Sequence, residues 1–181
     1  WSHLGGRLLW HKPCTHSCRS RFVGALIPQS KDDLRLHQPR ITFMEILKLS
    51  LQPGNRNYTL ALPDNHASGP PRPLILALHF AGHGSPHFGK LILTELVEPA
   101  LRELGAILLA PDCTGPDWTH PQSEADVLVL LDHIHANYNT DPSRTLITGY
   151  SMGGIGTWFI GSRHQERFSG ALIMAGIPPT G

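Results

Sequence analysis

The chain has 181 residues, of which 40% are hydrophobic and 16% charged, and its formal net charge at pH 7 is +1. This composition argues against wholesale disorder, and the length suffices for one domain of moderate size with its own core. The near-neutral charge gives no electrostatic reason to expect a nucleic acid or an anionic membrane as a partner. No apolar run approaches the roughly 20 residues of a membrane-spanning helix.

The N-terminal segment differs from the rest of the chain, because it mixes basic residues with Pro, Cys and Ser and follows no period of 2 or 3.6. We interpret residues 1–43 as a leader or disordered segment and residues 44–181 as the folded domain. Cys14, Cys18 and the nearby His11 are residue types that bind zinc. No second Cys/His pair follows at the spacing of a zinc finger, so the sequence predicts free thiols and no metal site.

A regular hydrophobic pattern starts at Met44 with a predicted β-hairpin. Residues 45–51 alternate apolar and polar side chains, as a half-exposed strand does. Residues 53–55 supply a Pro-Gly-Asn turn, and residues 58–62 return as the second strand. A loop rich in Pro, Gly, Ser and Asn follows over residues 63–73.

The chain then alternates strands with amphipathic helices. Two apolar runs, at residues 74–79 and 106–110, are typical of strands buried on both faces of a parallel sheet. Residues 145–148 and 171–175 are predicted as two further strands. Helical spacing of apolar residues predicts helices over roughly 89–104, 123–138 and 153–163. Ser123 is the expected cap of the second helix. This order predicts an α/β fold with a mostly parallel central sheet, helices on both faces and an antiparallel hairpin at its leading edge.

A G-x-S-x-G pattern lies between the strand at 145–148 and the following helix, with the sequence Gly149-Tyr150-Ser151-Met152-Gly153. A serine hydroxyl is a poor nucleophile that must be exposed, aimed and deprotonated by a base. A tight strand-to-helix turn projects Ser151 from the carboxyl end of the sheet, and the N-terminal dipole of the helix favours a developing oxyanion. We predict Ser151 as the catalytic nucleophile, Met152 as one oxyanion donor and Tyr150 as a pocket residue. The alternative is a purely structural glycine turn.

A glycine-containing loop directly follows the third predicted strand, with the sequence His79-Phe80-Ala81-Gly82-His83-Gly84. Such a loop can bring a backbone N–H close to a substrate carbonyl from the side opposite Met152. Ala81 is the preferred second oxyanion donor, with Phe80 as the alternative. His79 and His83 are candidate pocket residues. The competing interpretation is an ordinary glycine-rich connection.

Taken together, these motifs resemble the α/β-hydrolase superfamily. The nearest branch contains esterases, dienelactone-hydrolase-like proteins and prolyl-oligopeptidase-like predicted peptidases. The resemblance covers roughly residues 45–177 and is carried by the His79 loop, by Pro111-Asp112 after the next strand and by the run from Gly149 to Trp158. It implies a serine hydrolase that cleaves a carboxyl ester, or a peptide or thioester, through an acyl-enzyme and without a metal or organic cofactor.

Two features depart from the pattern of this family. The family usually has His-Gly where this chain has His79-Phe80. Its catalytic acid and histidine follow later strands, whereas this chain ends at Gly181, just beyond the sixth predicted strand, so these partners and the last strands are expected to be absent. The competing interpretation is therefore a catalytically incomplete hydrolase-like fragment or a non-enzymatic binding module.

Residues within the chain could substitute for the missing partners. His164 would lie about 20 Å from Ser151 along a helix, too far for a general base, which leaves His83 and His87 as alternatives. Asp112 and Asp117 are expected to shape the pocket or to cap turns.

Trp158 is expected in the core, against the nucleophile helix. A sheet that stops after its sixth strand would expose a parallel edge and apolar surface, which favours self-association. The expected partner is a small-molecule ester or peptide substrate. We expect a cytoplasmic location, because no signal or membrane segment is visible.

Overall fold

The computed structural model describes residues 44–82 and 84–179. The expected leader at 1–43, with its two cysteines, and the pocket candidate His83 lie outside the described residues. Within this part of the chain, no helix has the length and apolar character needed to cross a membrane.

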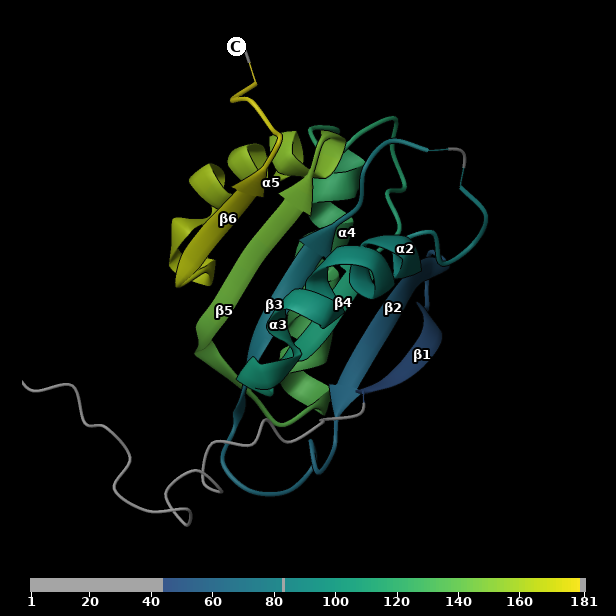
Figure 1. Ribbon diagram of the computed structural model, residues 1–181. Coiled ribbons are helices and arrows are strands. Elements are labelled where there is room, and N and C mark those ends of the chain that lie inside the picture. Colours follow the sequence, from purple (N-terminus) through teal and green to yellow (C-terminus); the bar gives the residue numbers. More distant parts are fainter. Residues whose placement is uncertain (1–43, 83, 180–181) are drawn as a thin grey trace, which may run out of the picture. The chain divides into compact units, whose positions relative to one another are not determined.

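The domain is built on a six-stranded sheet with the strand order β1-β2-β4-β3-β5-β6 (Figure 1). The strands are β1 (Met44–Leu51), β2 (Arg56–Pro63), β3 (Arg72–Leu78), β4 (Ile107–Pro111), β5 (Thr140–Tyr150) and β6 (Gly170–Met174). β1 and β2 form an antiparallel hairpin, and β2 also pairs antiparallel with β4, whereas β4, β3, β5 and β6 run parallel. The predicted α/β sheet with a hairpin at its leading edge is confirmed.

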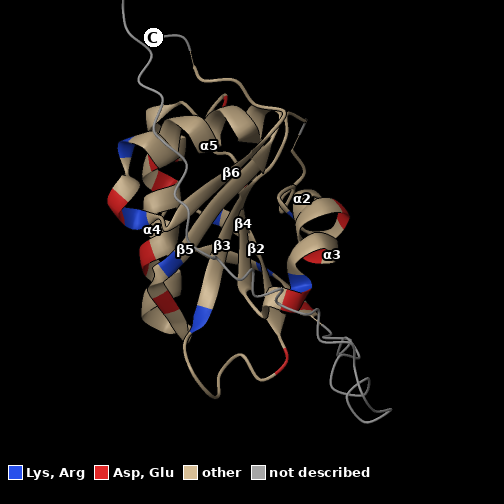
Figure 2. Ribbon diagram, turned by 60° about the vertical axis from the view of Figure 1, so that its left-hand side comes forward, with Lys and Arg blue, Asp and Glu red and all other residues tan. Residues whose placement is uncertain are grey.

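Helices cover both faces of the sheet (Figure 2). One face carries α2 (Lys90–Ile92), the π-helical turn η1 (Leu93–Val97), α3 (Glu98–Leu101) and the 3₁₀ turn η2 (Arg102–Leu104), and the other carries α4 (Pro121–Asn137) and α5 (Met152–Arg163). A further 3₁₀ turn, η3 (Gln165–Arg167), leads into β6. Each helical layer has its own apolar cluster, with Ile92 and Val97 on the first side and Leu130 and Ile160 on the second.

Two predicted helices differ from the observed ones. The single helix expected over 89–104 is divided, and Pro99 gives the reason: it has no N–H to donate to the carbonyl four residues earlier, so the α-helical ladder is interrupted. The expected cap Ser123 is wrong. α4 begins two residues earlier, with Pro121 at its first position and His120 as the cap, whose ring nitrogen accepts the N–H of Gln122 at 3.3 Å.

The expectation that Trp158 belongs to the core is also wrong, because its side chain is 40% exposed. The buried residues of α5 are small or β-branched: Gly153, Gly154, Gly156, Thr157 and Ile160. These residues let the helix lie close to the sheet, and Trp158, next in sequence to Thr157, projects from the other side. The helix therefore packs by close backbone approach and not by a large aromatic ring.

β6 is the edge strand on the side of the sheet away from the hairpin. Among the described strands it pairs with β5 and with no other, and its Leu172 side chain is 45% exposed. Self-association through this edge stays a prediction.

Candidate functional site

Ser151 occupies the single position between the last residue of β5 and the first residue of α5. Its backbone has φ 56° and ψ −114°, a conformation that costs a residue with a side chain on the order of 1–3 kcal/mol. The surrounding structure fixes it, because the Ser151 N–H donates to the carbonyl of Met174 and the N–H of Ile155 donates to the Ser151 carbonyl, both at 3.0 Å. Among the described residues, none forms a hydrogen bond with the Ser151 hydroxyl.

The glycines of the pattern are required by close backbone approach. A Cβ on Gly149 would lie 2.1 Å from the carbonyl oxygen of Gly153, and a Cβ on Gly153 would lie 1.9 Å from the carbonyl oxygen of Leu78. Both distances are far inside van der Waals contact. The G-x-S-x-G spacing is therefore what allows this turn to sit on the end of β3.

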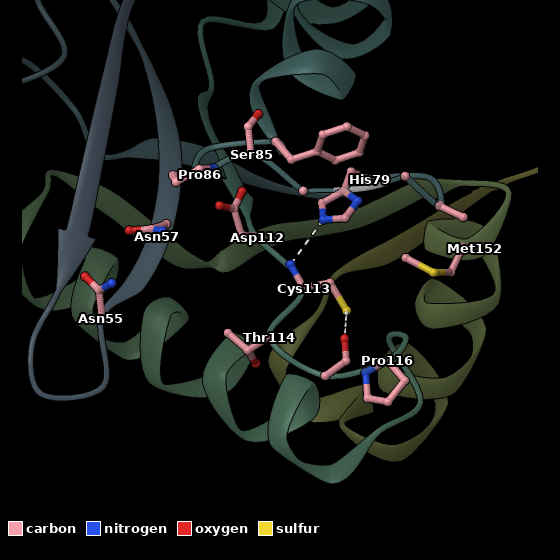
Figure 3. Close-up of a pocket in the computed structure, with 15 residues that line it drawn as sticks. Asn55, Asn57, His79, Ser85, Pro86, Asp112, Cys113, Thr114, Pro116 and Met152 are labelled. Atoms are coloured by element: carbon pink, nitrogen blue, oxygen red, sulfur yellow. Dashed lines mark hydrogen bonds between the residues drawn. The ribbon is translucent and has the colours of Figure 1, made fainter.

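A cavity of about 730 Å³ lies beside the turn at the carboxyl ends of β3 and β4 (Figure 3). Its walls come from the β1–β2 turn, the loops after β3 and β4, and the start of α5. The lining residues are Asn55, Asn57, His79, Ala81, Gly82, Gly84, Ser85, Pro86, Phe88, Asp112, Cys113, Thr114, Gly115, Pro116 and Met152. The two preferred oxyanion donors both line this cavity, Ala81 from the loop after β3 and Met152 from the start of α5.

His79, a candidate pocket residue, lines this cavity, but both of its ring nitrogens are engaged. Nδ1 donates to the carbonyl of Phe80 at 2.7 Å, and Nε2 accepts the backbone N–H of Cys113 at 3.1 Å. The indole N–H of Trp118 donates to the carbonyl of His79 at 2.9 Å. His79 therefore joins the loop after β3 to the loop after β4, and this geometry leaves it no free nitrogen to act as a base.

Burial lowers the pKa of His79, although its bond to Phe80 and the nearby Asp112 carboxylate oppose the shift. Above about pH 6.5 the ring is neutral in both the folded and the unfolded chain. Below that value the unfolded chain takes up a proton that the folded chain resists, so the free energy of unfolding falls. Burial also lowers the pKa of His135, which acts in the same direction.

We expect urea unfolding midpoints to decrease between pH 7.5 and pH 5.5, and to decrease less in His79→Gln. This window lies above the titration range of ordinary carboxylates. An equal loss in both proteins would show that His79 does not contribute to the pH dependence.

Asp112 and His87 belong to one hydrogen-bonded unit at the far end of the loop. The Asp112 carboxylate accepts the backbone N–H of His87 at 2.6 Å and that of Gly89 at 3.0 Å. The ring Nδ1 of His87 donates to the carbonyl of Tyr58 at 3.2 Å, and its φ is 66°. Asp112 thus both lines the pocket and caps a turn, as the sequence predicted.

The remaining candidates occupy different places. Phe80 and Tyr150 contact each other edge to face at 6.3 Å between ring centroids, beside the nucleophile turn. Tyr150 is 41% exposed, and neither ring lines the cavity. His164 is held at the opposite end of α5, where its Nε2 bonds to Glu124 of α4 at 2.8 Å. Asp117 accepts the N–H and the hydroxyl of Thr119, both at 2.7 Å, and so caps a turn.

Three residues at this site were not predicted. Trp118 is 1% exposed, and its indole N–H donates to the backbone carbonyl of His79. Phe88 lines the cavity and contacts the rings of His79 and Phe80 edge to face, at 4.9 and 5.6 Å. Burial raises the pKa of the Cys113 thiol, which keeps it protonated at neutral pH. The sequence signal for Phe88 was its position directly before the predicted helix at 89–104, whereas Cys113 and Trp118 lie within the loop between the predicted strand at 106–110 and the predicted helix at 123–138.

A second, smaller cavity of about 330 Å³ lies on the other side of Met152. It is formed by the loop after β4, the first turn of α5 and the segment after β6, with lining residues Asp117, Trp118, Thr119, Met152, Ile155, Ile177, Pro178 and Pro179. Met152 is the residue shared by both cavities. The described part of the chain contains no group of three or more His, Cys, Asp or Glu side chains placed to hold a metal ion.

Comparison with known proteins gives consistent matches. A family model described as "Putative esterase" matches residues 128–180, which include β5, the nucleophile turn, α5 and β6. The chain is 27% identical over 129 residues to "Probable feruloyl esterase C" of Aspergillus flavus, covering 67% of this chain and 47% of the relative. The corresponding protein of Aspergillus niger is 23% identical over 132 residues, covering 69% and 48%. The chain therefore spans about half the length of the curated relatives it matches.

Solved structures share the fold. "Crystal Structure of a Thermostable Esterase" matches with a TM-score of 0.63 and 22% identity, over 74% of this chain and 41% of that one. An acetyl xylan esterase from Aspergillus awamori matches with a TM-score of 0.60 and 19% identity, over 74% of this chain and 53% of that one.

Proposed function

We propose that this chain belongs to the esterase branch of the α/β-hydrolase superfamily and carries the nucleophile portion of a serine hydrolase that cleaves carboxyl esters of small molecules. The observation that carries the proposal is the turn at Ser151. A strained serine stands between a parallel strand and a helix, one residue before Met152, which lines a cavity of about 730 Å³. The relatives named feruloyl esterases support an ester rather than a peptide as the substrate.

The proposed reaction follows the two-step course of acyl transfer. The Ser151 oxygen adds to the ester carbonyl carbon, and the carbonyl electrons move to its oxygen, where the N–H groups of Met152 and Ala81 stabilise the negative charge. The alcohol then leaves with a proton, and water hydrolyses the acyl-enzyme. The general base is a histidine, which the chain order of this superfamily places after later strands than those described.

The test is hydrolysis of a short-chain nitrophenyl ester by the full-length protein and by its Ser151→Ala variant. We expect the variant to lose about 10⁴-fold or more in kcat, since removal of a nucleophile leaves the oxyanion donors alone. Ser162→Ala is the matched control, because this exposed serine lies in the last turn of α5 and bonds to the carbonyl of Phe159. Equal turnover by wild type and Ser151→Ala would refute the proposed function.

The second candidate function is a hydrolase-like module without catalysis. It is favoured by one observation: the hydrogen bonds of the described histidine rings go to residues other than Ser151. An ester-hydrolysis assay of the 181-residue chain by itself distinguishes the two candidate functions. Serine-dependent turnover by this chain would require a histidine of its own, with His83 and His87 to be replaced next, whereas no turnover beside an active full-length protein would place the base elsewhere. Self-association and a cytoplasmic location stay predictions.

A further inference from the structure

We take Ala81 as the second oxyanion donor, and residues 79–82 and 84–85, which follow β3, belong to no helix or strand. Ala81 and Gly82 are exposed, so burial of their own side chains does not fix their position. By contrast, Met152 sits on the first turn of α5. An N–H that stabilises an oxyanion must hold its position closely, because misplacement by about 1 Å can reduce the rate on the order of 100-fold. Contacts from outside the loop must therefore hold Ala81.

One such contact comes from Phe88. A Cβ on Gly82 would lie 2.2 Å from the tip of the Phe88 ring, so the backbone of Gly82 rests directly on this ring. The same ring contacts Phe80 at 5.6 Å and His79 at 4.9 Å, both edge to face. Phe88 thus touches the residues on both sides of Ala81.

Phe88 is in turn fixed by Asp112. The two residues that flank Phe88 in sequence are His87 and Gly89, and their N–H groups bond to different oxygens of the Asp112 carboxylate, at 2.6 and 3.0 Å. Asp112 itself is anchored, since its backbone N–H donates to the carbonyl of Asn57 on β2 at 2.9 Å. His87 adopts a φ of 66°, an unfavourable value for a residue with a side chain, which needs such bonds to persist.

We propose that Asp112 is a positioning residue for ester hydrolysis: through the two N–H bonds on either side of Phe88, it holds the Phe80–Gly82 turn so that the Ala81 N–H points at the developing oxyanion. The inference rests on the proposed function. Asp112 does not touch the reacting atoms in this role. Only a group that accepts at both oxygens can serve, because both partners are N–H donors.

The discriminating experiment compares an oxygen ester with the matching thionoester, in which sulfur replaces the carbonyl oxygen. A C=S group is a poor hydrogen-bond acceptor, so it gains little from the oxyanion donors. The rate for the oxygen ester divided by the rate for the thionoester therefore reports how well these donors are placed. In the full-length protein, Asp112→Asn puts an NH₂ donor against one of the two N–H groups. We expect kcat for the oxygen ester to fall roughly 10- to 100-fold, with a much smaller loss for the thionoester, so that the ratio falls.

A merely structural role predicts a different result. Loss of folded enzyme scales both substrates equally and leaves the ratio unchanged, and an unchanged ratio would overturn the proposal. Phe88→Leu removes the supporting ring while leaving Asp112 in place, and it should lower the ratio in the same way; it decides the matter if Asp112→Asn does not fold. If Ser151→Ala still hydrolyses the oxygen ester, the proposed function has failed, independently of Asp112.

The control is Asp141→Asn. Asp141 also caps a turn by accepting a backbone N–H, that of Ser143 at 3.0 Å, but it lies at the start of β5, whereas Ser151 follows its end. Its variant is expected to keep the wild-type ratio. A fall of the same size in Asp141→Asn would mean that the ratio responds to general loosening and would overturn the assignment to Asp112.

Discussion

Replacing Gly153 by alanine should destabilise the protein by about 3 kcal/mol or more and remove any Ser151-dependent activity. The added Cβ would lie 1.9 Å from the carbonyl oxygen of Leu78 and 2.8 Å from that of His79. Both are backbone atoms at the end of β3, a strand held on both sides by β4 and β5. Since neither the sheet nor the turn can give way, α5 must move away from the sheet, an overpacking penalty at the upper end of the usual range.

The matched control is Gly161→Ala in the same helix. A Cβ at this position would meet the side chain of Ile147 at 3.5 Å and Ala171 at 4.0 Å, which are ordinary contacts. Alanine is a better helix former than glycine by about 1 kcal/mol, so this variant should be as stable as wild type or more so. Urea unfolding followed by circular dichroism measures both. Equal stability of the two variants would show that the close approach at Gly153 is not required.

The sequence predicted the sheet well, because the signal for a buried parallel strand is local. Uninterrupted apolar runs identified β3, β4 and β6, and the Pro-Gly-Asn turn identified the hairpin. Glycine at 149 and 153 had a local reason too, since a serine turn between strand and helix requires small neighbours. The predictions were wrong where the position of a side chain depended on the element that packs against it. Trp158 faces outward because small residues fill the contact between α5 and the sheet, which helical spacing alone does not reveal.

The candidate site was predicted less completely, because its geometry joins segments that are distant in sequence. Asp112 bonds to His87 and Gly89, which lie 25 and 23 residues away, and His79 bonds to Cys113, 34 residues away. The glycine-containing loop after the third strand was predicted to carry an oxyanion donor, and its Ala81 lines the cavity, but the donor role itself stays a prediction. The sequence could not indicate that both ring nitrogens of His79 form hydrogen bonds, to Phe80 and to Cys113, which connect the loops after β3 and β4.

The sequence also could not predict the contact between Arg56 and Asp126, which are 70 residues apart. This contact supports Thr114 in the wall of the cavity. Arg56, next to the β1–β2 turn, forms an ion pair with Asp126 of α4, whose side chain is 7% exposed. Asp126 also accepts the Thr114 hydroxyl at 2.7 Å and the Gln122 amide at 3.0 Å. Burial acts to raise the pKa of Asp126, but the bonds from Thr114, Arg56 and Gln122 outweigh it and hold the pKa below its ordinary value.

Arg56→Met should therefore destabilise the protein by about 3 kcal/mol at pH 7, since removal of one partner leaves a buried carboxylate with less compensation. The difference from wild type should shrink as the pH falls below about 3.8, because the stability that comes with a depressed carboxyl pKa is lost once that carboxyl is protonated in the folded state.

Arg144→Met is the control for loss of an arginine, because Arg144 pairs with Asp141 on the exposed surface, where such a pair contributes about 0–1 kcal/mol. Urea unfolding at pH 7 and pH 3 compares the three proteins. If Arg56→Met loses no more stability than Arg144→Met, or loses the same amount at both pH values, then Asp126 does not depend on Arg56. In that case the bonds from Thr114 and Gln122 suffice to hold the Asp126 carboxylate.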